Sequence, residues 1–310
     1  MALLANSPVA SDAYGHLWHH LDRRVGVPFS ILDAENLGDY DLRRFNVLVL
    51  PPSSGLGDVL GPLKQQLASW VEGGGTLIAC GSAAAELTKG RLGLSQVVLR
   101  QDALEDLASY HKEAERERAA RKVVIDEEAV WNGATPEEPA LEGENGKPEA
   151  PDKDKDTDQK GADQKDTDQK DTDKKEKPNA DEETRARLFF PQGATLRGLV
   201  DPDAWITSGI DAVLPVLVSG ADVYLAKAPV TTAVRLEQAP ALRLGGLLWP
   251  EARARLAESA WLTVERKGHG QVVLFAAPPA FRGYHLASAR LFANAVVLGP
   301  GLGADQPDGW

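Results

Sequence analysis

Short apolar runs alternate with longer amphipathic stretches through the first 122 residues. Strands are predicted at residues 2–5, 29–32, 46–51 and 76–80, and helices at residues 11–25, 63–71, 81–87 and 102–122. The third and fourth apolar runs contain no charged side chain. Uncharged runs of this kind are typical of strands that are buried on both faces of a parallel sheet.

The helix predicted at residues 11–25 has one apolar face. Apolar side chains recur every three or four residues along it, at Tyr14, Leu17, Trp18, Leu21 and Val25. Ser11 is predicted to cap the helix and Gly26 to end it. His16, His19 and His20 lie off the apolar face, so we expect them in solvent and predict no native metal site.

The chain after residue 184 has a more mixed pattern. Strands are predicted at residues 214–218, 222–226, 231–236, 261–265 and 271–276, and helices at residues 249–256 and 288–298. The turn at residues 267–270 joins the last two strands into a predicted hairpin. The repeated alternation predicts an α/β fold, with an open, doubly wound, mostly parallel, flavodoxin-like sheet and a small β-rich addition.

Residues 133–184 interrupt this pattern. They hold 18 Asp and Glu, nine Lys, a single Leu and no Ile, Val, Phe, Tyr, Trp or Met. Such a segment cannot bury enough apolar surface to offset the entropy lost on ordering, so we predict a disordered acidic insert. The first part of the α/β domain then spans residues 1–132, and residues 185–310 supply its completion and the β-rich addition.

Charge and cysteine content exclude several classes of protein. The insert carries −9 of the formal net charge of −12, so the remainder is nearly neutral and lacks the basic face of a nucleic-acid-binding protein. No apolar run reaches the roughly 18 residues of a membrane span, and the first residues lack the basic start of a signal peptide. The single cysteine, Cys80, excludes internal disulfides and multi-cysteine zinc sites. We predict no cofactor.

Candidate ligand-binding residues directly follow predicted strands. Ligands of open α/β sheets bind beyond the carboxyl ends of the strands, near the switch in strand order. The loops at residues 51–55, 80–82 and 277–285 reach that edge. We therefore predict a crevice lined by Ser53, Ser54, Gly55, Gly81, Arg282 and Tyr284. The guanidinium of Arg282 could bind a carboxylate or phosphate there. Alternatively, Arg282 could form a structural ion pair that holds its loop over the sheet.

Residues 73–85, Gly-Gly-Gly-Thr-Leu-Ile-Ala-Cys-Gly-Ser-Ala-Ala-Ala, resemble the strand–turn–helix of class I glutamine amidotransferase-like domains. In that family a nucleophilic cysteine, activated by a histidine, stands on a tight elbow that needs small residues two positions to either side. An elbow centred on Cys80 has the bulky Ile78 at one of these positions. Centred on Gly81 or Ser82, the elbow has small residues on both sides. The pattern favours a degenerate elbow, with Ser82 as the only reactive rival to Cys80.

The histidine of the amidotransferase pattern is displaced in this sequence. In the family a histidine directly follows a late strand, with an acidic residue two positions further on. Here Pro278 and Pro279 follow the strand, and the nearest histidine, His285, has no carboxylate after it. Cys80, Ser82 and His285 are therefore weak catalytic candidates, and an inert buried thiol is the alternative for Cys80.

A wider set of motifs resembles the amidotransferase-like domain found C-terminal to bacterial zinc carboxypeptidases of the carboxypeptidase A type. The set occurs in the same order and comprises residues 14–22, 45–51, 73–79, 214–224 and 268–283. In that family the peptidase domain binds zinc through His-x-x-Glu and a later histidine. None of the six histidines here has a glutamate three residues later. The resemblance implies an accessory domain that is partnered, in cis or in trans, with a zinc carboxypeptidase domain.

These observations are compatible with three functions. The preferred one is a non-catalytic amidotransferase-like accessory or interaction domain. The alternatives are a hydrolase or amidase that depends on Cys80 or Ser82, and a module that binds a small molecule, glycan or peptide through Arg282, Tyr284 and the Ser53 loop. The chain is expected in the cytoplasm if Met1 is its native start, and exported if it belongs to a larger secreted peptidase.

Overall fold

The computed structural model describes residues 1–121 and 187–304. The predicted insert at residues 133–184 lies outside these residues. The chain divides into one compact unit of Met1–Ala114 with Arg185–Trp310 and a second unit of Glu115–Thr184. The first unit holds all described strands of the sheet, and with them the carboxyl edge at which the candidate site was predicted.

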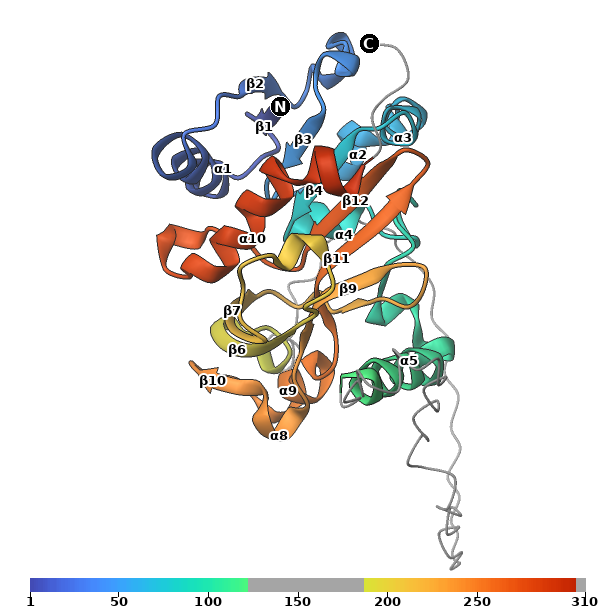
Figure 1. The fold of residues 1–310 in the computed structure, drawn as a ribbon, viewed down its shortest axis with the longest axis vertical. Coiled ribbons are helices and arrows are strands. Elements are labelled where there is room, and N and C mark those ends of the chain that lie inside the picture. Colours follow the sequence, from blue (N-terminus) through green and yellow to red (C-terminus); the bar gives the residue numbers. More distant parts are fainter. Residues whose placement is uncertain (122–186, 305–310) are drawn as a thin grey trace, which may run out of the picture. The chain divides into compact units, whose positions relative to one another are not determined.

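Five parallel strands form one half of the sheet (Figure 1). They are β1 (Ala2–Ala5), β2 (Ser30–Asp33), β3 (Val47–Leu50), β4 (Thr76–Cys80) and β12 (Gly270–Phe275), in the order β2-β1-β3-β4-β12. Every residue of β1, β3, β4 and β12 is buried. With β12 in fifth place, this is the strand order of a flavodoxin-like, doubly wound sheet. The predicted α/β class is confirmed.

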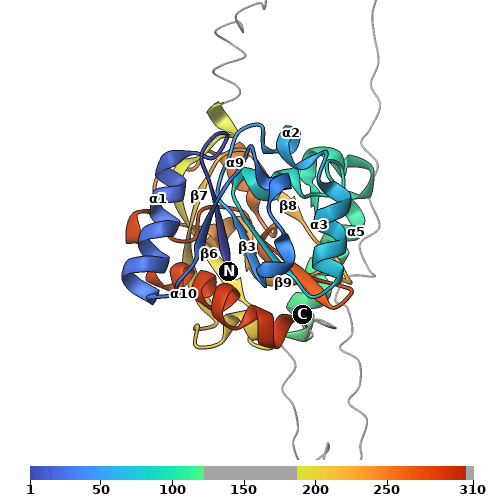
Figure 2. The ribbon, with the colours of Figure 1, turned by 90° about the horizontal axis from the view of Figure 1, so that it is seen from above.

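Helices cover both faces of the parallel half (Figure 2). They are α1 (Ser11–His19), which continues as a π-helical turn (His20–Val25), α2 (Leu56–Leu60), α3 (Lys64–Glu72), α4 (Ser82–Glu86) and α10 (Leu286–Val297). The helix α5 (Leu107–Ala120) instead places Tyr110 in a small separate cluster with Val98 and Leu225. Alternate residues of each strand enter two separate cores. One core contains side chains of α1 and α10, and the other contains side chains of α2, α3 and α4.

Antiparallel strands extend the sheet beyond β12 and form the predicted β-rich addition. They are β5 (Val98–Leu99), β6 (Gln192–Val200), β7 (Val213–Ser219), β8 (Tyr224–Leu225), β9 (Thr231–Leu236), β10 (Arg243–Gly245) and β11 (Ala260–Lys267), with the helices α8 (Ala239–Leu242) and α9 (Pro250–Leu256). The predicted hairpin is confirmed, since β11 pairs with β12 across a turn at Gly268 and His269. β6 is missing from the predicted strands because two glycines and an arginine interrupt its apolar pattern.

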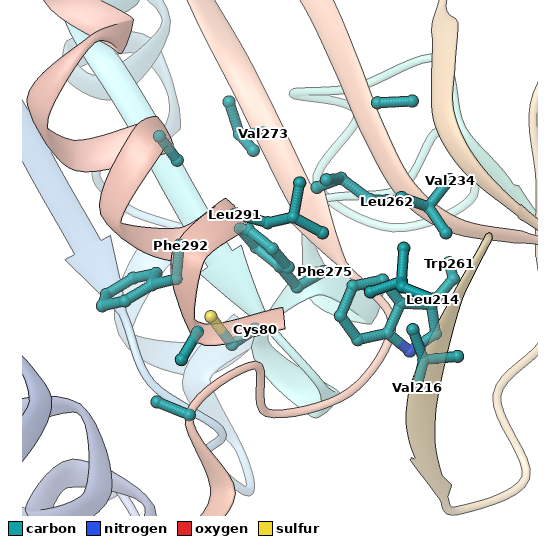
Figure 3. Packing of buried hydrophobic residues seen from close by; sticks show 14 of the residues in the cluster. Cys80, Leu214, Val216, Val234, Trp261, Leu262, Val273, Phe275, Leu291 and Phe292 are labelled. Carbon is teal, nitrogen blue, oxygen red and sulfur yellow. The ribbon is translucent and has the colours of Figure 1, made fainter. Parts of the chain in front are cut away.

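Three aromatic side chains join the two halves of the sheet to α10 (Figure 3). The rings of Trp261 and Phe275 meet edge to face with centroids 5.8 Å apart, and Phe275 meets Phe292 at 6.2 Å. The indole Nε1 of Trp261 also donates to the Leu217 carbonyl at 3.2 Å. All three rings are almost completely buried, so this cluster fixes α10 on the strands that carry the candidate site.

Two predictions for the first helix are wrong. The residue before the helix is Ala10, which makes no side-chain cap, and Ser11 lies inside the first turn. His20 is only 9% exposed rather than in solvent, because α10 packs on it through Phe292. His16 is half-buried under Phe281, with ring centroids 5.1 Å apart, and only His19 is exposed. The covering segments lie more than 260 residues away in the sequence, so the local pattern cannot reveal them.

Within residues 1–121 and 187–304, no helix has the length and apolar character needed to cross a bilayer.

Candidate functional site

The loops that follow β1 and β3 are tied together at the carboxyl edge of the parallel strands. Val9 and Ser53 form an isolated β-bridge. The Ala10 amide donates to the Pro52 carbonyl at 3.1 Å, and the Ser54 amide donates to the Pro8 carbonyl at 3.4 Å. β1 and β3 flank the switch in strand order, which is where ligands bind in sheets of this kind. The loop that carries Ser53 therefore lies beside the switch in strand order, and the crevice itself stays a prediction.

Gly81 is the single residue between β4 and α4. Its φ of 56° and ψ of −129° form a sharp strand-to-helix turn that side chains rarely allow. Its amide donates to the Phe275 carbonyl of β12 at 2.8 Å, and its carbonyl accepts from the Tyr224 hydroxyl at 2.8 Å. A nucleophile elbow holds its reactive residue in such a strained turn. The geometry thus puts Gly81, rather than Cys80 or Ser82, at the tip of the elbow.

Two prolines lie beside the position that a Cβ atom of residue 81 would take. A Cβ atom added to Gly81 would lie 3.2 Å from Cγ of Pro52 and 3.8 Å from Cδ of Pro278. The first distance is closer than ordinary van der Waals contact. The tip of the elbow therefore has no nucleophile, and a Cβ atom there would require the Pro52 ring to shift by a few tenths of an ångström.

Cys80 points away from the strand-end edge into the core under α10 (Figure 3). Its side chain is fully buried in the apolar cluster that contains Phe275, Leu291 and Phe292. Burial raises the pKa of the Cys80 thiol far above its ordinary value near 9. Because the thiolate is the reactive form, the thiol behaves here as a small apolar side chain.

The Ser82 hydroxyl is used to join two loops. It accepts from the Ser53 amide at 3.0 Å and donates to the Ser53 carbonyl at 2.8 Å. The Ser53 hydroxyl donates to the Pro51 carbonyl at 2.8 Å. Both serine hydroxyls are thus hydrogen-bonded to backbone. Among the described residues neither is bonded to an imidazole, so neither has the general base that a serine nucleophile requires.

His285 precedes α10 and is half-buried. Its carbonyl accepts from the Ala289 amide at 3.0 Å and from the Ser288 hydroxyl at 3.0 Å, and burial lowers the pKa of its imidazole. No hydrogen bond joins its imidazole to Cys80 or Ser82 within the described part of the chain. The three weak catalytic candidates are therefore not brought together as a nucleophile–base pair.

Arg282 and Tyr284 lie on the loop that packs against α1. Arg282 has a positive φ of 47° and holds its guanidinium 5.1 Å from the ring centroid of Phe281. Tyr284 is 77% exposed, and Ser54 and Gly55 are also exposed. Of the predicted crevice residues, Ser53 is thus hydrogen-bonded to Ser82, the residue after Gly81, while Arg282 and Tyr284 lie on a different loop, just before α10.

In the two described ranges, no cluster of three or more His, Cys, Asp or Glu side chains is arranged to hold a metal ion.

Sequence reasoning missed Tyr224 as a residue of the elbow. It is 2% exposed and comes from β8 in the β-rich addition, yet its hydroxyl donates to the Gly81 carbonyl.

Tyr224→Phe removes this donor and leaves the Gly81 carbonyl without it, so we expect a loss of about 1–2 kcal/mol in the free energy of unfolding. Urea denaturation measures the loss. Tyr284→Phe, at an exposed ring, is the control and should change nothing; equal effects of the two variants would contradict the structural role of Tyr224.

The buried histidines make stability depend on pH. Burial lowers the pKa of His16, His20 and His285 below the ordinary value of 6.5. As the pH falls through that value, the unfolded chain takes up protons before the folded chain does, so the free energy of unfolding decreases. We expect a lower melting temperature at pH 5.5 than at pH 7.5, and a smaller drop in His20→Gln than in the control His19→Gln. Identical drops in the two variants would show that His20 does not contribute.

Comparisons with known proteins give only distant structural likeness. The sequence matches no family model and no curated protein. A candidate GMP synthase component from Thermoplasma acidophilum is similar over 96% of this chain and 92% of that chain, with 10% identity and a TM-score of 0.48. Cytoplasmic protein STM3548 from Salmonella typhimurium is similar over 98% of this chain and 99% of that chain, with 10% identity and a TM-score of 0.43. Scores at this level do not assign a function or a family.

Proposed function

We propose that this chain is a non-catalytic, amidotransferase-like accessory or interaction domain. The observation that carries the proposal is the glycine at the tip of the elbow, with Pro52 and Pro278 over the place of its missing side chain. An acyl-transfer enzyme needs a nucleophile and a base within hydrogen-bonding reach of each other. Gly81 offers no nucleophile, the Cys80 thiol is buried, and the Ser82 hydroxyl is bonded to backbone.

The proposed partner is a zinc carboxypeptidase-type protein, in cis or in trans. The support is the ordered set of sequence motifs that resembles the domain attached to such peptidases. Those motifs fall on α1, β3, β4, β7 and β12, and each of these elements contributes side chains to the core that contains Cys80. Mixing the chain with a purified carboxypeptidase A-type catalytic domain and measuring association by sedimentation velocity tests this part. The absence of a complex at micromolar concentrations would argue against association in trans.

The rate of Cys80 alkylation tests the non-catalytic proposal. A thiol tuned for catalysis reacts quickly near neutral pH, whereas a buried thiol reacts only when the fold opens. We expect iodoacetamide at pH 8 to modify the folded chain at least roughly 100-fold more slowly than the chain unfolded in urea. Cys80 is the only cysteine, so intact mass spectrometry reads the reaction directly. Comparable rates in the two states would favour the cysteine-dependent hydrolase instead.

A second candidate function is binding of a small molecule, glycan or peptide at the loop before α10. It is favoured by the 77% exposure of Tyr284 and by the exposed Arg282 two residues before it, which forms no ion pair with any described residue. Thermal shift against a panel of sugars, peptides and carboxylates tests it. Stabilisation that is lost in Arg282→Ala would support binding, and stabilisation that is unchanged in Arg282→Ala would exclude this loop.

A further inference from the structure

The loop between β12 and α10 lies on α1. Its short turn Phe281–Gly283 sets the ring of Phe281 edge to face with the imidazole of His16, with the ring centroids 5.1 Å apart. A Cβ atom added to Gly283 would lie 3.5 Å from Nη2 of Arg24, which belongs to the π-helical turn after α1. These contacts cover one face of α1, and we call residues 281–284 the strap.

Hydrogen bonds hold the two ends of the strap. The Ser288 hydroxyl of α10 donates to the carbonyl of Pro279 at 2.6 Å and to that of His285 at 3.0 Å. Inside the strap, the amides of Gly283 and Tyr284 donate to carbonyls three residues earlier, at 3.2 and 3.1 Å. Within residues 1–121 and 187–304, no hydrogen bond joins the strap to α1. Packing holds the strap on the helix, so it can lift while its ends stay in place.

His16 has a buried ring nitrogen without a hydrogen-bond partner. Its Nδ1 atom has neither a donor nor an acceptor beside it among the described residues. A neutral imidazole can leave one nitrogen unprotonated, whereas both nitrogens of an imidazolium are donors. Protonation would therefore make Nδ1 a buried, charged N–H group without an acceptor, which is costly. The strap in its closed position favours neutral His16.

The charges around His16 are unevenly placed. Burial is the main cause that lowers the pKa of His16, the Asp12 carboxylate of α1 raises it, and the Arg282 guanidinium of the strap lowers it further. Arg282 acts on His16 from the strap, so its effect weakens when the strap lifts. The other titratable groups of the elements that meet here are Tyr14, His19, His20, Asp22, Arg23, Arg24, Tyr284, His285 and Arg290.

We propose that acidification releases the strap from α1 while the sheet stays folded, with His16 as the sensor. Once Phe281 lifts, Nδ1 of His16 reaches water and Arg282 moves away. The lifted form then takes up a proton at a higher pH than the closed form does, so falling pH shifts the equilibrium towards the lifted form. Because Arg282 and Tyr284 are strap residues, pH would control how they are presented to a ligand. The proposal goes beyond the proposed function and does not depend on whether the elbow is catalytic.

The other two half-buried or buried histidines are placed differently. The Phe292 ring lies on His20, with centroids 6.0 Å apart, and is itself fixed in the aromatic cluster with Phe275. Protonation of His20 therefore opposes the packing of α10 as a whole rather than that of the strap. The carbonyl of His285 accepts from the Ala289 amide and the Ser288 hydroxyl, so this residue stays with α10 when the strap lifts.

Hydrogen exchange of the Gly283 and Tyr284 amides tests the proposal. The rates are measured with residue resolution in the full chain and expressed as protection factors, which removes the pH dependence of intrinsic exchange. We expect protection to fall at least threefold between pH 7.5 and pH 5.5, and by no more than about tenfold, because one proton is taken up. The amide of Val273 in β12 should keep its protection.

Three variants separate the sensor from its surroundings. His16→Gln should abolish the loss of protection, because glutamine does not titrate. Arg282→Gln should make the loss smaller, since it removes a charge that opposes protonation of His16 only in the closed form. His285→Gln is the matched control from the same loop and should leave the loss unchanged. An NMR titration of the parent chain, which needs no variant to fold, should give His16 a pKa below its ordinary value of 6.5.

Several outcomes would overturn the proposal. They are equal protection of the strap amides at the two pH values, loss of protection in step with Val273, an undiminished loss in His16→Gln, and a pKa of His16 at or above 6.5. A loss well above about tenfold would require more than one proton and would contradict a single sensor. Rapid labelling of Cys80 would overturn the proposed function and leave the strap result standing.

Discussion

Gly270→Ala is expected to lower the free energy of unfolding by more than about 4 kcal/mol, enough to leave little folded protein. Gly270 opens β12 and lies against the end of α3 and the start of β4. A Cβ atom there would overlap the backbone oxygens of Val71 and Gly75 and come within 2.9 Å of the Gly75 amide nitrogen. Backbone atoms at this point cannot move aside without breaking the register between β12 and β4.

Gly15→Ala is the matched control for this substitution. Gly15 lies in α1, and an added Cβ would meet nothing within 4 Å. Because alanine favours a helix more than glycine does, the control should be unchanged or more stable by up to about 1 kcal/mol. Urea denaturation of both variants measures the difference. A Gly270→Ala variant as stable as the control would contradict the close packing of the hairpin on α3.

Gly81→Ala should have the second largest effect, a loss of about 2–4 kcal/mol in the free energy of unfolding. Its φ of 56° and ψ of −129° are unfavourable for any residue with a Cβ atom, and the Pro52 ring lies 3.2 Å from the position of that atom. Gly81→Cys should suffer the same loss, and its thiol would lie against Pro52. We therefore expect that the thiol introduced by Gly81→Cys does not react quickly with electrophiles.

Gly55→Asn separates the effect of the elbow from the general effect of replacing a glycine at positive φ. Gly55 has φ of 81° and ψ of 18°, a left-handed conformation that asparagine tolerates, and only Asp58 Oδ2 approaches an added Cβ, at 3.9 Å. We expect a loss below about 1 kcal/mol. If Gly81→Ala lowered the free energy of unfolding as little as Gly55→Asn does, the backbone at Gly81 would not be strained and the Pro52 ring would not crowd the added Cβ atom.

The parallel half of the sheet is well predicted from the sequence because its strands are buried on both faces. The uncharged runs that form β3 and β4 have the length and composition of strands buried on both faces. β6 and β10 could not be predicted in the same way. Arginines and glycines, among them Arg197, Gly198 and Arg243, interrupt their apolar patterns. β6 is held in the sheet by pairing with β7, β9 and β10, which all come later in the chain.

The site is predictable only in part. The steric pattern of small residues around Gly81 indicates a degenerate elbow from sequence alone. The Tyr224 hydroxyl on the Gly81 carbonyl, the bonds from Ser82 to Ser53, and the Phe292 ring on His20 each join segments that are far apart in the sequence. Such pairings are set by the tertiary fold, and no local residue pattern encodes them.

The claim that the elbow is not catalytic is tested most directly by exposing the folded chain to two electrophiles, a chloroketone analogue of glutamine and a fluorophosphonate. Intact mass spectrometry then detects any adduct. A glycine at the elbow tip, a buried thiol and backbone-bonded serines predict that neither reagent forms an adduct at pH 7, although the chloroketone should modify Cys80 once urea unfolds the chain. A stoichiometric adduct on the folded chain that disappears in Cys80→Ser or Ser82→Ala would contradict the account and show that the elbow is catalytic.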